Sequence, residues 1–487
     1  MLHCQPRPLI TFSTHPSTVR YDALLTRQKN KNFQHPTFNI MKFKYFFLGI
    51  INAIAVFNAS AQTRYSSNDG MLHVDLKKAI DIALDENPTV RVAEKEVELK
   101  VIADKEAWQA LLPEIAVTGT LQHTLLAAEM KLGGNSFKMG KDNTNTVNVG
   151  ASLNIPLFAP AVYQNMKLTK EDIKLAQEKC RGSKLELINQ VTKAYYQALL
   201  AQDSYLVMKQ SYETSKLNYD IVSERERVGK TSEYDKLSAE VQMRAMNSSM
   251  VAAENGQNLA MLQLKVLMGV TANIRLAIDD ELENYEPQIV IPQILDQERQ
   301  LIDNSVMRQF ELNRNLLERS YKIAKASFLP TVSFTLAGQY QSLYNDNWEL
   351  WNYDYVPSAS FTINVSVPIY RASNWTRLKT VKLQMAELED NRTNTLRNLN
   401  MAADSYRTNM MSSLAQVNSN SIAVAQAEKA LSISNKRYEV GRGTILEVNQ
   451  SQTALTQAQL TYNQSIYDYL INKSDFDYTL GKETYLK

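Results

Sequence analysis

Two short glycine-containing stretches decide the fold of this chain. Residues 437–448 read Arg-Tyr-Glu-Val-Gly-Arg-Gly-Thr-Ile-Leu-Glu-Val, and residues 227–231 read Arg-Val-Gly-Lys-Thr. Glycine readily adopts the left-handed backbone that ends a helix, and a following Ser or Thr caps the next helix by accepting a hydrogen bond from a backbone N–H. Each stretch therefore predicts a turn between two helices.

Long helices are predicted on both sides of each turn. No proline occurs between Pro160 and Pro287, and none follows Pro368. Because proline removes a helical hydrogen bond and clashes with the preceding turn, such tracts indicate uninterrupted helices. Apolar residues recur within them at steps of three and four, which is typical of coiled-coil packing with one solvated face. We expect helical hairpins at about 161–268 and 374–480.

The two hairpins belong to an internal duplication. Three landmarks repeat at a shared offset of 212 residues, namely Ile155–Phe158 with Val367–Tyr370, Val228–Lys230 with Val440–Arg442, and Gly269 with Gly481. A single match of this kind is expected by chance, but a shared offset indicates a repeat. We therefore divide the chain into a first repeat at 62–287 and a second repeat at 288–487.

Each repeat carries two stretches in which apolar and polar residues alternate. These lie at about 114–123 and 146–156 in the first repeat, and at about 331–341 and 358–369 in the second. Alternation predicts strands with one apolar and one polar face, as in a soluble sheet packed on helices or in a membrane barrel. Strands of about ten residues suit a tilted membrane crossing. Since four strands cannot close a barrel, spanning strands would require oligomerisation.

The N-terminal residues have the features of an export signal. Residues 41–61 contain two lysines, a short apolar core and a small-x-small cleavage pattern before Gln62, although a buried N-terminal helix is the alternative. Residues 1–40 have four prolines and no periodicity, so we interpret them as a non-native upstream extension. The first 61 residues hold seven basic residues and one acid, which leaves the remainder of the chain net acidic.

The composition argues against several classes of function. A formal charge of +2 on 487 residues does not favour nucleic-acid binding. The 15 glycines are about 3% of the chain against a usual ~7%, which disfavours glycine-rich nucleotide-binding folds. Two cysteines are too few for a disulfide scaffold or a Cys-rich zinc domain. The sequence shows no catalytic grouping, phosphate loop or metal-ligand cluster, so we predict no enzyme, cofactor or metal.

With its turn motif, duplication and signal, the chain from about Leu72 to Leu480 resembles the TolC-type outer-membrane efflux protein family. The resemblance implies a mainly α protein with a membrane β-barrel. Four strands per protomer would form one twelve-stranded barrel in a homotrimer, and the helices would form a periplasmic tunnel. It implies a passive gated channel whose partners are a periplasmic adaptor, an inner-membrane pump and outer-membrane lipid. A periplasmic helical scaffold without a pore is the alternative.

The resemblance also assigns a gate latch at the turns. Tyr438 matches the family's gating tyrosine, and Asp235 matches its acidic partner. The gating arginine of the family aligns with Gly443, so the neighbouring Arg442 is the candidate substitute. Ordinary surface positions are the alternative interpretation of Asp235 and Tyr438.

A pore constriction follows from the same resemblance, and the paired glycine-containing turns, which project together, are expected to dock the adaptor. Glu447 matches the first pore-lining carboxylate, and Gln450 stands where a second is expected. Three copies of Glu447 would form a ring that attracts cations, although an acid at the start of a helix is also favoured by the helix dipole. The residues expected to dock the adaptor are Gly229, Lys230, Thr231, Gly441, Arg442, Gly443 and Thr444.

Overall fold

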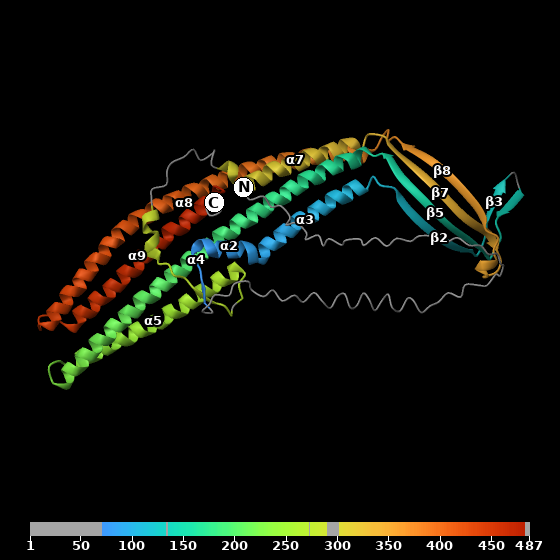
Figure 1. Cartoon of the computed structure of the whole chain (residues 1–487). Helices are drawn as coiled ribbons and strands as arrows, with labels where there is room; N and C mark the ends of the chain where they lie inside the picture. Colours follow the sequence, from blue (N-terminus) through green and yellow to red (C-terminus); the bar gives the residue numbers. More distant parts are fainter. Residues whose placement is uncertain (1–70, 133–134, 272, 290–300, 483–487) are drawn as a thin grey trace, which may run out of the picture. The chain divides into compact units, whose positions relative to one another are not determined.

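The computed structural model describes residues 71–132, 135–271, 273–289 and 301–482 (Figure 1). The predicted export signal and upstream extension lie outside the described residues. The unit that begins at His73 contains the helices and strands that bear on function.

The two repeats share a plan, in which a 22-residue helix precedes two long strands and a helical hairpin follows them. The first repeat contains β1 (Met71–His73), α2 (Leu76–Glu86), α3 (Pro88–Gln109), β2 (Glu114–Thr124), β3 (Ala128–Leu132), β4 (Asn135–Met139), β5 (Thr144–Phe158), α4 (Pro160–Arg227) and α5 (Glu233–Met268). The first repeat also contains β6 (Arg275–Ala277), and η2 (Leu282–Gln288) ends it at the boundary with the second. The second repeat contains η3 (Leu301–Asp303), α7 (Ser305–Ala326), β7 (Thr331–Asn345), η4 (Leu350–Asn352), β8 (Val356–Ser366), α8 (Ala372–Glu439) and α9 (Ile445–Thr479).

Two very long helices dominate the fold, as the proline-free tracts predicted. Helices α4 and α8 each contain 68 residues, which at 1.5 Å per residue is a length of about 100 Å. Each packs against the second helix of its hairpin, and both turns lie at the end of the helices away from the sheet (Figure 1). The predicted pair of long-helix hairpins is thus confirmed. No helix among the described residues has both the length and the hydropathy that crossing a membrane requires.

The four long strands form one antiparallel sheet in the order β2-β5-β7-β8. The pairing of β5 with β7, for example Val149 opposite Tyr340, joins the first repeat to the second. The four strands were predicted, but β5 and β7 are longer than expected, and β8 ends at Ser366 rather than at residue 369. The small hairpin β3–β4 between β2 and β5 was not predicted.

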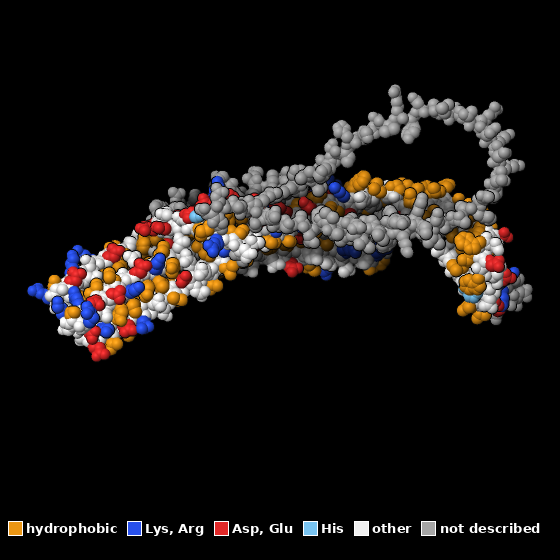
Figure 2. Space-filling view, turned by 60° about the horizontal axis from the view of Figure 1, so that its bottom comes forward, with side chains coloured by type: hydrophobic (Ala, Val, Ile, Leu, Met, Phe, Trp, Pro, Cys, Tyr) orange, Lys and Arg blue, Asp and Glu red, His pale blue; other side chains and the backbone are white. Residues whose placement is uncertain are grey.

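The sheet exposes a broad apolar face. Side chains that alternate along β2 and β8 remain uncovered, with Val117 76% exposed and Phe361 71% exposed. Figure 2 shows hydrophobic side chains gathered over the sheet, whereas Lys, Arg, Asp and Glu side chains are interspersed toward the hairpin turns. An exposed apolar area on this scale indicates contact with lipid or protein.

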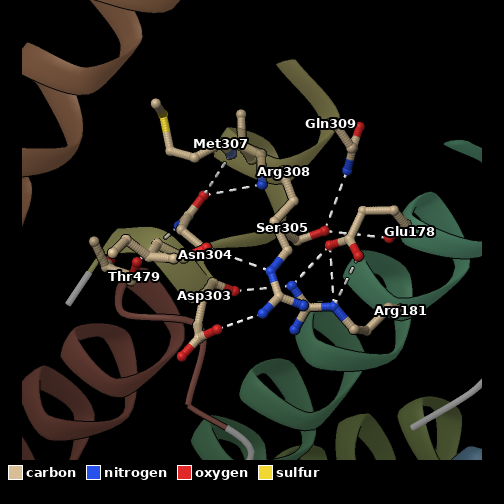
Figure 3. Close-up of polar contacts among 11 residues, drawn as sticks. Glu178, Arg181, Asp303, Asn304, Ser305, Met307, Arg308, Gln309 and Thr479 are labelled. Carbon is tan, nitrogen blue, oxygen red and sulfur yellow. Dashed lines mark hydrogen bonds and ion pairs between the residues drawn. The ribbon is translucent and has the colours of Figure 1, made fainter. Parts of the chain in front are cut away.

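A buried asparagine joins two helices at the root of each hairpin, which we define as the end of its second helix, α5 or α9, away from the turn. The side-chain Oδ1 of Asn304 caps α7 by accepting from the Val306 N–H at 2.9 Å, and its side-chain amide Nδ2 donates to the backbone carbonyl oxygen of Thr479 at 2.7 Å (Figure 3). Asn87 repeats the arrangement, capping α3 and donating to the Leu267 carbonyl oxygen at 2.7 Å. Each cap therefore also satisfies a carbonyl at the end of the hairpin.

The second root has an additional buried ion pair. Arg181 of α4 lies 2.7 Å from Glu178, and both side chains are almost fully buried. The Arg181 guanidinium also donates to the carbonyl oxygen of Asp303 at 2.8 Å, directly before the Asn304 cap (Figure 3). These contacts join α4 of the first hairpin to the start of α7.

The segment around η2 also joins the two hairpins, at a point distant from their turns. The segment around η2 packs against both α4 and α9. Its Leu282 N–H donates to the Asp203 carboxylate of α4 at 3.0 Å, while Glu286 accepts a hydrogen bond from Tyr462 of α9. Burial, with nearby acidic side chains, raises the pKa of Asp203 to about 6.

The asparagine caps yield a stability prediction. Asn304→Ala removes the α7 cap and leaves the Thr479 carbonyl without its amide donor, so we expect a loss of about 2–3 kcal/mol in the free energy of unfolding. Asn304→Asp keeps the capping oxygen but loses the amide donor, so its loss should be smaller than that of the alanine variant. Urea unfolding in detergent, followed by circular dichroism, measures both.

Asn247→Ala is the matched control, because Asn247 is exposed on α5. This control should change the free energy of unfolding by less than about 0.5 kcal/mol. Equal midpoints for Asn304→Ala and Asn247→Ala would contradict the role of the caps.

Candidate functional site

Both hairpin turns use a left-handed glycine to end the first helix. Gly229 has φ +73° and Gly441 has φ +72°. The following residue, Lys230 or Arg442, donates its N–H to a carbonyl five residues earlier at 2.8 Å, as in a Schellman motif. A Cβ on either glycine would meet no atom within 4 Å. Backbone conformation rather than space therefore requires glycine here.

The helix after the first turn begins with a capping box. Ser232 accepts from the Asp235 N–H at 3.1 Å, and the Asp235 carboxylate in turn faces the Ser232 N–H. The hydroxyls of Thr231 and Ser232 both donate to Asp235 Oδ2 at 2.8 Å. The hydrogen bond from Thr231, and then those from Ser232, hold the pKa of Asp235 below its usual value.

Asp235 and Tyr438, the predicted latch partners, occupy different surroundings. None of the hydrogen bonds described for Asp235 reaches Tyr438, because they all lie within its own turn. The Tyr438 ring instead faces the first hairpin, where the Arg225 guanidinium carbon lies 5.2 Å from the ring centroid. The Arg442 side chain is exposed at the tip. The backbone carbonyl oxygen of Arg442 accepts a hydrogen bond from the Arg437 guanidinium at 3.2 Å.

A small apolar cluster holds the two hairpins together just behind the turns. It consists of Val222 of α4, Ala239 of α5, and Ile445 and Val448 of α9, each at most 2% exposed. The Tyr438 ring packs against this cluster. The cluster therefore fixes the ring at the place where the hairpins meet.

Glu447 and Gln450, the predicted constriction residues, lie in the first turns of α9. Thr444 caps this helix by accepting from the Glu447 N–H at 3.3 Å. The Glu447 carboxylate lies 3.2 Å from Arg437, and both side chains are partly exposed, so the ion pair contributes little to stability. Gln450 is exposed and lines a shallow groove with Tyr234 and Val241 of α5.

Arg225 and Arg437 are the site residues that the sequence analysis missed. They occupy equivalent positions in the two repeats, in the last turn of α4 and of α8. The duplication was a signal that could have identified them, since it aligns a basic residue before each glycine turn. Among the described residues, no group of three or more His, Cys, Asp or Glu side chains is arranged to hold a metal ion.

Comparison with known proteins identifies the class of molecule. A family model described as "Outer membrane efflux protein" matches residues 79–270 and 298–481. The outer membrane protein TolC of Vibrio cholerae is 20% identical over 380 residues, which cover 76% of this chain and 82% of TolC. The alkaline protease secretion protein AprF of Pseudomonas aeruginosa is 22% identical over 400 residues, which cover 80% of both chains.

Solved structures share the fold. CusC superposes with a TM-score of 0.68 at 16% identity, over 86% of this chain and 96% of CusC. The CmeC outer membrane channel of Campylobacter jejuni superposes with a TM-score of 0.66 at 17% identity, over 83% of this chain and 85% of CmeC. Since the family model matches most of the chain and the hairpin architecture agrees, this chain belongs to the outer membrane efflux protein family.

Proposed function

We propose that this outer-membrane channel is a passive, gated conduit, and that it serves a tripartite efflux or type I secretion system. The observation that carries the proposal is the joining of an exposed apolar sheet to two hairpins whose first helices are each about 100 Å long. The sheet suits lipid, and the hairpins are long enough to extend far into the periplasm. In this proposal the channel is not an enzyme. It conducts passively, and the pump supplies the energy for transport.

Closure of the sheet leads to a trimer. Among the described strands, β2 and β8 each have one neighbour in the sheet, which leaves an edge of unpaired backbone groups on both. Each unpaired group costs several kcal/mol in lipid, so spanning strands must form a closed barrel. We infer three protomers, as the family resemblance implies, and three four-stranded sheets then make one twelve-stranded barrel within the range of known membrane barrels.

The hairpin turns form the periplasmic end of the conduit in this proposal. Glu447 and Gln450 line the constriction, with three copies of the carboxylate around the threefold axis. The latch suggested for Asp235, Tyr438 and Arg442 lies at the same end. Tyr438 is the member of that set whose ring contacts the opposite hairpin.

The exposed turns also dock the periplasmic adaptor in this proposal. Lys230 and Arg442 are exposed directly after their glycines, on two turns at the same end of the helices (Figure 1). The inner-membrane pump then joins the assembly together with the adaptor. Residues 41–61 act as the cleaved signal that directs export, and residues 62–287 and 288–487 are the two repeats.

Conduction tests the function itself. The mature protein should fractionate with the outer membrane, and the purified protein should conduct ions across a planar lipid bilayer, because the barrel and the tunnel enclose water. A protein found in the soluble periplasm that gives no bilayer conductance would instead support a helical scaffold without a pore.

Ion selectivity tests the constriction. Glu447→Gln removes three carboxylates from the proposed ring, so the permeability ratio of K⁺ to Cl⁻ should fall severalfold in bilayer recordings. Glu439→Gln is the matched control, because Glu439 is an exposed acid at the end of α8 that the proposal places outside the ring. An unchanged ratio in Glu447→Gln, or an equal fall in the control, would reject the ring.

Site-specific crosslinking tests the docking surface. A photo-crosslinking residue at Lys230 or Arg442 should capture the adaptor in cells, because both side chains project from the turns. The control position is Trp351, which is 96% exposed in the loop at the far end of the sheet. Capture of the adaptor from Trp351, or its absence from both turns, would count against docking at the tips.

A further inference from the structure

The duplication allows the two hairpin turns to be compared residue by residue. The repeat offset of 212 makes Arg225 equivalent to Arg437, and Asp235 equivalent to Glu447. Each turn thus has a basic residue before its glycine and an acid in the first turn of the next helix. In the second hairpin these two residues form an ion pair at 3.2 Å.

The first hairpin does not form the equivalent ion pair. Its acid, Asp235, accepts hydrogen bonds from Thr231 and Ser232 at 2.8 Å each. The guanidinium of Arg225 extends to the other hairpin, where it lies over the Tyr438 ring. The arginine therefore acts within its own hairpin in the second repeat and between hairpins in the first, while the acid stays within its own turn in both.

The two turns also differ at the residue that follows Lys230 or Arg442. Thr231 is equivalent to Gly443. The Thr231 hydroxyl donates a hydrogen bond to the Asp235 carboxylate, whereas Gly443 has no side chain that could do the same for Glu447. A Cβ on Gly443 would lie only 3.1 Å from Arg437 Cβ and 3.2 Å from Glu447 Oε2. Glycine therefore leaves room for the ion pair in the second turn, whereas the Thr231 and Ser232 hydroxyls hold the Asp235 carboxylate within the first turn.

The surroundings of Tyr438 favour attraction between the cation and the ring. The ring is half-buried against the apolar cluster behind the turns, so its position is fixed and part of its water is excluded. A guanidinium about 5 Å from a ring centroid lies within the range of a cation–π interaction. This contact requires the aromatic ring and does not require the tyrosine hydroxyl.

We propose that Arg225 is the positioning residue that holds the two hairpin tips together through the Tyr438 ring, and that Thr231 frees it for this contact by occupying Asp235. The inference rests on the proposed function as a gated channel. It assigns to Arg225 the contact with Tyr438 that the family resemblance suggested for Asp235. Loss of the contact favours separation of the tips and therefore the open channel.

Two substitutions at Tyr438 separate ring chemistry from hydroxyl chemistry. In bilayer recordings, Tyr438→Leu and Arg225→Gln should each raise the ratio of open to closed channel roughly two- to fivefold for each protomer, the range expected for a partly exposed cation–π contact. Tyr438→Phe should match the wild type, because it keeps the ring. The double variant Arg225→Gln/Tyr438→Leu should be no more open than either single variant.

Thr231→Gly tests whether the hydrogen bond from Thr231 to Asp235 leaves Arg225 unpaired with Asp235 and so able to contact the Tyr438 ring. This substitution gives the first turn the residue found in the second, so Asp235 should pair with Arg225 and the open fraction should rise as in Arg225→Gln. The control is Arg227→Gln, because Arg227 lies in the same helical turn, is 72% exposed and pairs with Glu224. This control should leave the open fraction unchanged.

A distance measurement tests the contact without relying on conduction. Spin labels at Lys230 and Arg442, in samples diluted with unlabelled protein, report the separation of the two tips by pulsed electron paramagnetic resonance. The distribution should broaden toward longer distances in Arg225→Gln, Tyr438→Leu and Thr231→Gly, and should stay unchanged in Tyr438→Phe and Arg227→Gln. Absence of conductance together with these shifts would overturn the channel function and leave the contact standing.

Two results would overturn the proposal itself. The first is an equal effect of Tyr438→Phe and Tyr438→Leu, since that would assign the latch to the hydroxyl. The second is a wild-type distance distribution in Arg225→Gln. Unchanged midpoints of thermal unfolding would show that each variant keeps its fold.

Discussion

Backbone hydrogen bonding at the two edges of the sheet is the constraint on which the rest of the molecule depends. Within the described residues, β2 and β8 each have a single neighbour, and the apolar face between them is exposed. An edge of this kind is tolerated in water but is prohibitively costly in lipid. A sheet of this composition is therefore incomplete as one chain, and the proposed trimer completes it. The barrel in turn positions the helical hairpins, because α4 follows β5 and α8 follows β8 directly in the chain.

The duplication explains how one chain supplies two similar hairpins. Asn87 and Asn304 fasten the roots in the same way, by capping a helix and donating to the end of the hairpin. The tips begin from the same plan but diverge at Thr231 and Gly443. A rigid root with a tip that differs between repeats allows the hairpins to move apart at one end while their other end stays anchored.

Much of the fold could be predicted from the sequence because its signals are local. Proline kinks or breaks a helix interior, so the proline-free tracts after Pro160 and Pro368, together with apolar residues at steps of three and four, predicted α4 and α8. Alternation with a period of two was likewise sufficient for the four long strands. The β3–β4 hairpin was missed, since it adds five-residue strands within a loop.

The site was less accessible to sequence reasoning, because its contacts join residues far apart in the chain. Family resemblance identified Tyr438 but not the side chain that faces it. The partner, Arg225, lies more than two hundred residues away on another helix, and its availability depends on a hydroxyl that occupies Asp235. Such competition between neighbouring polar groups is decided by geometry, which residue types alone do not determine.

The mass of the assembled protein tests the central claim most directly. Native mass spectrometry of the protein extracted from membranes should give the mass of three chains, the number that makes the proposed twelve-stranded barrel and pairs the edges that one chain leaves free. A single chain released under conditions that preserve bilayer conductance would contradict the account, since the conducting barrel would then have to close without β2 and β8 of other copies.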